Sequence, residues 1–457
     1  MGGFFLLQAA AERLAQAREG LDIPLGQRLI GLLGIAVMIG IAVLLSYDRK
    51  KINWRLVFTG LGIQALFGII VLKTGAGRAV FAAVGNVITR LLGFQEQGAR
   101  FVFGNLVQSS VPVGLPGPGG TLDSTAGLVA NTGAFFAFNV LPTIIFFSAL
   151  MSVLYYLGVM QLIVKGIAWA MQKSLGTSGA ETLSASGNIF LGQTEAPLLI
   201  KPFVKTFTPS ELVTVMVGGF ATVAGGVLAA YVGMLQGAFP GIAAHLLAAS
   251  VMNAPAGLLL SKIIMPETGE PVTKGSLKLP VEKTESSVIE SAANGAATGV
   301  QLAINVAAML MAFVALVALL NALLGWAGGF VGLPELSLQA ILGTLLRPLA
   351  WVMGVPWQDT AYVGSLIGLK TSLNEFVAYA QFASDLSGPL VLAPRSAIIL
   401  TYALLGFANF SSIAIQIGGI GGLAPERRGE IARFGLRAMI AGNLAAFISA
   451  SLAGMLT

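Results

Sequence analysis

The sequence contains no cysteine and a single histidine, His245, among its 457 residues. Without cysteine there is no disulfide and no thiolate metal site, and one histidine excludes a His-rich metal cage and leaves little choice of base for a Ser/His triad. Charged residues make up only 10% of the chain, whereas a soluble domain carries about a quarter. Hydrophobic residues make up 56%, and the mean hydropathy is +0.84. The composition therefore predicts an all-α polytopic membrane protein.

The net charge of +6 is distributed in short clusters of Lys and Arg between apolar runs rather than on one face. This pattern argues against nucleic acid as a partner and for a lipid bilayer. Two clusters, 49–55 and 427–437, are expected on the cytoplasmic side by the positive-inside rule, which places both termini outside the cell (inner) membrane. Residues 1–24 are expected to form an interfacial helix or tail.

The hydropathy pattern predicts eight membrane spans. Stretches in which charges recur among apolar residues are expected to lie along the interface. A Gly/Pro-rich segment, 111–123, is predicted to be an external loop, and the charged segment 266–287 a soluble one. The expected spans are 29–46, 56–72, 134–157, 209–235, 242–264, 288–326, 392–417 and 438–455, and the interfacial stretches are 75–106, 159–172 and 336–355.

Two apolar segments are too polar at their centres to cross the membrane simply. They are 187–203, with the sequence GNIFLGQTEAPLLIKPF, and 361–386, which contains GLKTSLNEFVAYAQF. The flanking charges require each to begin and end on one side, so both are predicted to be re-entrant hairpins. Each precedes a glycine-interrupted span, GGFATVAGG or GFANFSSIAIQIGG. The sequence thus predicts inverted repeats with a substrate site between broken helices.

A carboxylate at membrane depth is costly, so Glu195 is interpreted as functional rather than as an interfacial residue or a partner of a lysine. Gln193 and Thr194 beside it add amide and hydroxyl groups, which suits a hydrogen-bonding heterocyclic base. In the second half, Glu375 can accept two hydroxyl donors, as a sugar diol offers. Asn409 and Ser412 share a helix face. Phe407 either packs in the core or forms an aromatic wall for the solute.

The strings GNIFLGQTEAPLLIKPF, SLNEFVAY and GFANFSSIAIQIGGIGGLAPERR resemble the signatures of the concentrative nucleoside transporter family, sodium-coupled branch. The resemblance implies a homotrimer whose protomers combine a scaffold with a transport domain that moves as an elevator. It also implies eight transmembrane helices, two hairpins and interfacial helices. On this basis the scaffold comprises 25–74, 133–178 and 288–335. The transport domain comprises 179–265 and 336–457, with 75–132 joining it.

The resemblance also implies roles for individual residues. Gln193, Thr194 and Glu195 match positions that hold the nucleobase, Glu375, Asn409 and Ser412 those that hold the ribose, and Phe407 lines the pocket. The sodium site maps to the Asn188 side chain, the Leu191 carbonyl, Thr222 and the Val223 carbonyl. Thr222 stands where serine is common and keeps the hydroxyl.

Several alternatives stay open at this level. Asn188 taken alone could cap a loop, and a proton acting through Glu195 or Glu375 is the alternative coupling ion to Na⁺. An intramembrane hydrolase is disfavoured because GxSxG and HExxH are absent, and His245 in AAHLLAAS is expected to pack between helices. A channel would need a continuous polar path. The sequence therefore predicts a secondary active transporter of nucleosides, such as uridine, and not an enzyme.

Overall fold

The computed structural model describes residues 25–108, 110–116, 122–131, 136–275, 285–330, 332–388 and 390–457. The predicted interfacial helix or tail at 1–24 and part of the predicted soluble loop at 266–287 lie outside these ranges. The described residues are mostly helical, which confirms the predicted fold class.

The elements follow one another in two series. The first contains α2 (Leu25–Leu44), α3 (Trp54–Lys73), α4 (Gly75–Phe103), β1 (Ser110–Pro116), β2 (Leu122–Asn131), α5 (Leu141–Tyr156), α6 (Val159–Leu175), α7 (Gly179–Gly187), α8 (Pro209–Ala221), α9 (Gly225–Leu235) and α10 (Ile242–Ile264). The second contains α11 (Val288–Gly329), α12 (Leu338–Val352), α13 (Thr360–Ser372), α14 (Glu375–Leu386), α15 (Pro394–Leu404), α16 (Phe410–Leu423) and α17 (Arg428–Leu456). Short 3-10 segments lie at Arg49–Lys51, Gly104–Val107, Ala196–Thr206, Trp357–Asp359 and Pro425–Arg427, and a π-helical turn lies at Phe136–Val140.

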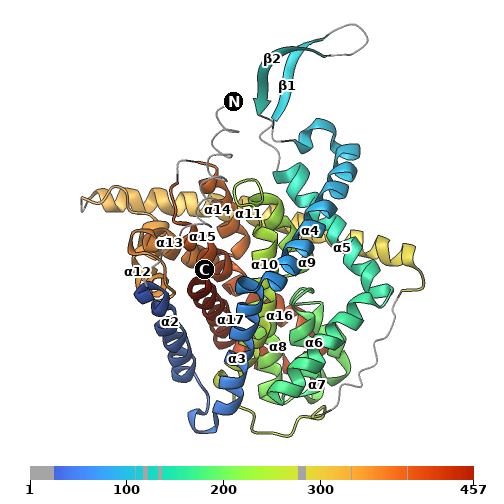
Figure 1. Ribbon diagram of the computed structural model, residues 1–457, viewed down its shortest axis with the longest axis vertical. Coiled ribbons are helices and arrows are strands. Elements are labelled where there is room, and N and C mark those ends of the chain that lie inside the picture. The colour runs from blue at the N-terminus through green and yellow to red at the C-terminus, as the bar shows by residue number, and fades with distance from the viewer. Residues whose placement is uncertain are drawn as a thin grey trace.

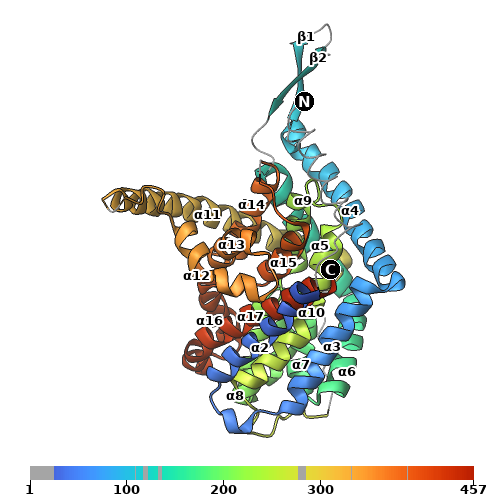
Figure 2. The same cartoon turned by 60° about the vertical axis from the view of Figure 1, so that its left-hand side comes forward.

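The helices form one body from which the β1–β2 hairpin projects (Figure 1). Figure 2 shows α11 on one side of this body and α4 along the other. The interrupted pair α8–α9 and helix α10 lie in the interior. Of the residues in their most apolar stretches, 94% and 83% are buried, against 6% for α11. The long helix α11 is therefore a peripheral element that packs along α5.

Each of the eight predicted spans corresponds to a helix or to an interrupted pair of helices. Within the described part of the chain, six segments are long and apolar enough to cross a membrane by length and composition: Trp54–Lys73, Phe136–Tyr156, Pro209–Leu235, Ile242–Ile264, Val288–Gly329 and Pro425–Leu456. The other two predicted spans fall on shorter apolar helices, Arg28–Leu44 in α2 and the interrupted pair α15–α16.

The β1–β2 hairpin corrects the prediction of an external loop at 111–123. The strands pair antiparallel, from Ser110 opposite Asn131 to Pro116 opposite Leu122. In β1 the apolar residues Val111, Val113 and Leu115 alternate with serine, proline and glycine, and this period of two suits a strand. Residues 75–106, expected to lie along the interface, contain the 29-residue helix α4 and the start of the 3-10 segment Gly104–Val107.

Both predicted hairpins are present as pairs of short helices. In the first, α7 leads to a non-helical tip and then to the 3-10 segment Ala196–Thr206. This hairpin begins at Gly179, earlier than the predicted residue 187, and Ser178 starts it with a capping box to Glu181. In the second, α13 and α14 meet at Leu373 and Asn374.

The two interrupted helices touch where each is interrupted. Thr222 leaves the α8 helix in an extended conformation, with φ −122° and ψ 177°. At the other interruption Gly406 has φ +118°, a conformation that favours glycine, and a Cβ there would lie 2.7 Å from the Phe220 carbonyl oxygen. The N–H of Phe407 donates to the Thr222 carbonyl at 3.2 Å. The glycine therefore permits the close approach that joins the two interruptions.

Each interruption is capped in the same way by an asparagine of the helix that follows it. Asn253 of α10 donates to the Ala221 carbonyl at 2.7 Å. Asn443 of α17 donates to the Ala408 carbonyl at 2.9 Å. The matching caps support the interpretation of the two series as structural repeats.

Candidate functional site

A cavity of about 150 Å³ lies beside the joined interruptions. Both hairpins and both interrupted helices line it, and α11 contributes a wall. All seven residues predicted to bind substrate line this cavity: Gln193, Thr194, Glu195, Glu375, Phe407, Asn409 and Ser412. Gln193 and Ser412 are 219 positions apart yet share a hydrogen bond. The fold therefore brings together side chains that the sequence keeps apart.

Glu375 is an acceptor held from two sides. It begins α14, whose N-terminus Asn374 caps by accepting from the Val377 N–H at 2.8 Å. The Glu375 side chain is 3% exposed. Its Oε1 accepts from the Tyr231 hydroxyl at 2.9 Å, and its Oε2 accepts from Asn409 Nδ2 at 3.0 Å. A carboxylate has about four acceptor sites, so the group can still accept hydroxyl donors from a ligand.

Asn409 and Ser412 occupy the first turn of α16. The Asn409 side chain caps this helix by accepting from the Ser412 N–H at 2.9 Å. The same oxygen accepts from the Ser411 hydroxyl at 2.7 Å. Because its Nδ2 is also engaged with Glu375, the Asn409 amide is fixed at both ends before any ligand binds.

The Gln193 amide lies between two residues of α16. Its Nε2 donates to Ser412 Oγ at 3.1 Å, and its Oε1 accepts from Gln416 Nε2 at 3.2 Å. Gln416 also donates to the Met216 carbonyl at 3.0 Å. A continuous hydrogen-bonded network therefore links the tip of the first hairpin, through Ser412 and Asn409, to Glu375 at the tip of the second.

The other three predicted residues complete the wall. Glu195 accepts from the Gly192 N–H at 3.1 Å, which turns its carboxylate back toward the hairpin tip. Thr194 is exposed at the cavity. Its methyl group lies against Gly419 of α16, where an added Cβ would come within 2.9 Å of it. The half-buried Phe407 packs against the core and also lines the cavity.

Two of the four predicted sodium ligands, Asn188 and Thr222, bring their side chains to the first interruption. Asn188 is fully buried, and neither atom of its amide has a hydrogen-bond partner. Its side chain is thus not engaged as a loop cap. Thr222 Oγ1 donates to the Gly218 carbonyl at 2.9 Å, and a Cβ on Gly218 would lie 3.2 Å from Asn188 Nδ2. Both side chains therefore reach the same turn of α8.

The hairpin tip is fixed against this turn by a hydrogen bond from the Gly225 N–H to the Phe190 carbonyl at 2.8 Å. Leu191 and Val223 flank that bond and are buried. A buried amide without partners is uncommon and calls for a ligand or ion. Amide, hydroxyl and carbonyl oxygens at a helix interruption fit Na⁺, because their partial negative charges replace its water.

Several residues that line the cavity, or that hold the side chains lining it, were not predicted from the sequence. The Tyr231 hydroxyl, from α9, donates to Glu375, which is 144 positions away in the sequence, and no local sequence pattern predicts that contact. Gln416 follows Ser412 by one helical turn, so its place on the same face could have been predicted. Neither Tyr231 nor Gln416 lines the cavity itself; the unpredicted lining residues include Asn374, Phe376, Ser411 and four apolar side chains of α11: Leu302, Val306, Met309 and Leu310.

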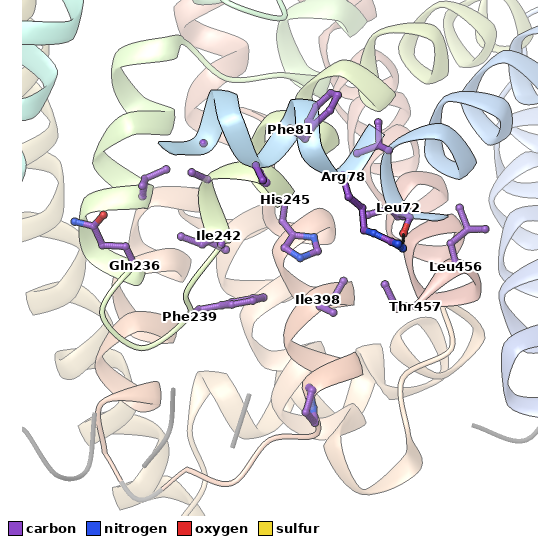
Figure 3. Close-up of a pocket in the computed structure, with 18 of the residues that line it drawn as sticks. Leu72, Arg78, Phe81, Gln236, Phe239, Ile242, His245, Ile398, Leu456 and Thr457 are labelled. Carbon is purple, nitrogen blue, oxygen red and sulfur yellow. Dashed lines mark hydrogen bonds between the residues drawn. The ribbon is translucent and has the colours of Figure 1, made fainter. Parts of the chain in front are cut away.

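A larger cavity, of about 890 Å³, lies between α3, α4, the loop joining α9 to α10, and the C-terminus (Figure 3). Its lining includes Arg78, whose guanidinium donates to the Leu72 and Lys73 carbonyls, and His245. His245 is 9% exposed, with its ring 5.6 Å from that of Phe239, as its predicted packing role requires. The predicted substrate and sodium residues are not part of this lining.

Two hairpin and interrupted-helix units around one polar cavity define the class of the protein as a secondary transporter. Comparison of the sequence with protein families agrees. Residues 33–106 match the Na⁺ dependent nucleoside transporter N-terminus, 245–454 match its C-terminus, and 137–238 match a nucleoside recognition (Gate) domain. The chain belongs to the Na⁺ dependent nucleoside transporter family. It is therefore a multi-pass membrane transporter, not an enzyme, and the family supports Na⁺ as the coupling ion.

Individual relatives cover almost the whole chain. An uncharacterized transporter of Haemophilus influenzae is 45% identical over 93% of this chain and 97% of its own length. Sodium/nucleoside cotransporter 1 of Rattus norvegicus is 41% identical over 94% of this chain, which spans 64% of that protein. Among solved structures, CNTnw in an inward-facing substrate-bound state matches with a TM-score of 0.83 and 45% identity, covering 94% of this chain and 97% of that one.

Proposed function

We propose that this protein carries a nucleoside, uridine or a close relative, into the cell together with sodium. The observation that carries the proposal is the convergence of all seven predicted substrate residues, from both hairpins and the second interrupted helix, on one cavity that the first interrupted helix also lines. A ligand seated there contacts both repeats at once. Such a site can be exposed to one side of the membrane and then to the other.

The polar groups suit the two parts of a nucleoside separately. Glu375 and Asn409 belong to the second hairpin and the second interruption, and they combine a carboxylate acceptor with an amide, as ribose hydroxyls require. Gln193, Thr194 and Glu195 belong to the first hairpin and offer donors and acceptors to a base. Ser412 lies between the two groups, bonded to Gln193 by its hydroxyl and to Asn409 by its N–H. Phe407 supplies an apolar surface beside them.

Sodium is assigned to Asn188, the Leu191 carbonyl, Thr222 and the Val223 carbonyl. The partnerless amide of Asn188 supports this assignment. The tip that presents Gln193 continues directly from these ligands, so an ion bound there would order the base-binding side chains. Such coupling is reciprocal, since the nucleoside must then tighten sodium binding equally.

The proposal includes an elevator movement of the transport domain, 179–265 and 336–457, along the scaffold. The hydrogen bond between Ser152 and Ser291, at 3.0 Å, joins α11 to α5 within the scaffold, whereas Asn321 of α11 is bonded to Leu338 and Gln339 where the chain enters the transport domain. The α11 side chains that face the cavity are apolar. An apolar surface favours sliding because no directional bonds are broken. The proposed assembly is a homotrimer in the inner membrane, with both termini outside.

Uptake of labelled uridine into proteoliposomes tests the function. An inward sodium gradient should drive accumulation above the external concentration, and an inside-negative potential should speed it, since each charge gains about 2.3 kcal/mol per 100 mV. Accumulation driven by a proton gradient without sodium would show that the coupling ion is the proton and not sodium. Equilibration without accumulation under every gradient would refute active transport.

A further inference from the structure

We propose that Gln416 is a positioning residue that selects the base by fixing the Gln193 amide with its N–H toward the ligand. The class of substrate selected is nucleosides whose base presents a carbonyl oxygen at the C4 position, as uridine does. This inference rests on the proposed nucleoside transport and adds a structural origin for its base preference.

The orientation of both glutamine amides is set by a backbone carbonyl, which can only accept a hydrogen bond. The Met216 carbonyl can accept a hydrogen bond but cannot donate one. It therefore requires the Nε2 end of the Gln416 amide, which donates to it at 3.0 Å. Gln416 is fully buried, so solvent offers the side chain no alternative partner for the reversed orientation.

The same Nε2 donates to Gln193 Oε1 at 3.2 Å. Gln193 must therefore direct its oxygen to Gln416 and its Nε2 to the other side, where it donates to Ser412 Oγ at 3.1 Å. Ser412 does not determine this choice, because a hydroxyl can donate or accept. An amide nitrogen carries two hydrogens, so the second N–H of Gln193 remains for a ligand.

Gly219 provides the space for this arrangement. A Cβ at this position would lie 2.8 Å from Gln193 Cβ and 2.9 Å from Gln416 Nε2. The residue belongs to α8, as does Met216, so one turn of this helix both admits and orients the two amides. This observation is independent of the hydrogen-bond assignments and shows that the contact between the two glutamines is built into the backbone.

Equilibrium binding at saturating sodium tests the inference with the full chain. The ligands are uridine and 4-thiouridine, which keeps the N3 hydrogen but presents at C4 a sulfur, a much weaker acceptor, and the proteins are wild type, Gln416→Met, Gln193→Ala and the double variant. The wild type should prefer uridine roughly tenfold, the worth of one good hydrogen bond. Gln416→Met, which keeps the length of the side chain but releases the Gln193 amide, should reduce that preference to about threefold or less.

A buried glutamine elsewhere provides the matched control. Gln64 is also fully buried and donates to Ser449 Oγ at 2.8 Å, outside the cavity. Gln64→Met should therefore leave the uridine preference unchanged. Gly219→Ala is a second variant that disturbs the contact between Gln416 and Gln193 without removing either residue, because its methyl group crowds both amides. It should lower the preference as well.

The double variant separates positioning from a merely structural role. If Gln416 acts through Gln193, adding Gln416→Met to Gln193→Ala changes the ratio no further. A wild type without preference for uridine overturns the inference, as does a Gln416→Met variant that weakens both ligands equally and keeps the ratio. Absence of sodium-dependent uridine binding in the wild type would instead refute the proposed function, so the two failures are distinguishable.

Discussion

Replacing Asn188 with leucine should separate sodium binding from the stability of the fold. Asn188 is fully buried and both of its amide atoms lack partners. A buried polar group left unsatisfied costs about 1 to 3 kcal/mol. Leucine has nearly the same shape and carries no polar atoms. In sodium-free buffer, Asn188→Leu should therefore be at least as stable as the wild type, although it alters a buried site.

Sodium should reverse this order. An ion that binds only the folded protein adds about 2.7 kcal/mol to its stability at 100 times the dissociation constant. The wild type should gain this stabilisation and Asn188→Leu should not. Thermal unfolding of the purified protein, in sodium chloride and in choline chloride of equal ionic strength, measures both effects.

The matched control is Asn443→Leu, which removes the amide that caps the second interruption at Ala408. That variant should lose stability in both salts and keep the sodium-dependent increase. A sodium-dependent increase of equal size in Asn188→Leu would refute the assignment of Asn188 as a ligand. Large destabilisation of Asn188→Leu in choline would refute the argument from the unsatisfied amide.

Three further predictions concern Glu375, the residue that holds it, and Lys370. Glu375→Gln, measured by uridine binding, should cost about 1.5 to 3 kcal/mol because an amide cannot accept from both of its present donors; an equal loss for a dideoxynucleoside would argue against ribose recognition. Tyr231→Phe removes one of those donors and should weaken uridine binding by about 1 kcal/mol, so unchanged affinity would contradict the Glu375 contact. Lys370→Met should lower the unfolding temperature, since the buried ammonium donates to the Ala403 and Leu405 carbonyls at 3.0 and 3.4 Å. Lys370→Arg should recover part of that loss, and no loss in Lys370→Met would show that these bonds are not stabilising.

The hydropathy of the sequence was sufficient to predict the eight spans and both hairpins, because lipid imposes length and polarity limits on each segment. It misplaced the start of the first hairpin for a physical reason. Residues 179–186 are polar, yet all of α7 is buried. Glu181 forms an ion pair with Lys262 at 2.6 Å, and Lys262 also donates to Ser210. A charged side chain is tolerated in the protein interior when an opposite charge pairs with it. Here that partner lies on a helix distant in the sequence, so the sequence alone does not reveal the pair.

The candidate site was predictable to a different extent. Side chains such as Glu195 and Glu375 were found because a carboxylate is costly in an apolar segment. Tyr231 and Gln416 were not, because tyrosine and glutamine are ordinary near membrane interfaces and gain their roles only through contacts across the fold. The sequence therefore indicates groups that can touch a ligand. The residues that orient those groups can be recognised only from the contacts in the folded protein.

The two interruptions differ in the charge that faces them, and this difference supports the proposed place of sodium. The C-terminal end of a helix carries about −0.5 elementary charge, which a nearby cation offsets. At the end of α15 the ammonium of Lys370 supplies that cation from within the chain. At the end of α8 the donor to the last carbonyl, that of Ala221, is the neutral amide of Asn253, which is the counterpart of Asn443 at the second interruption. A neutral cap satisfies one carbonyl but leaves the partial charge uncompensated, so a dissolved cation is favoured at the first interruption, where Asn188 and Thr222 lie.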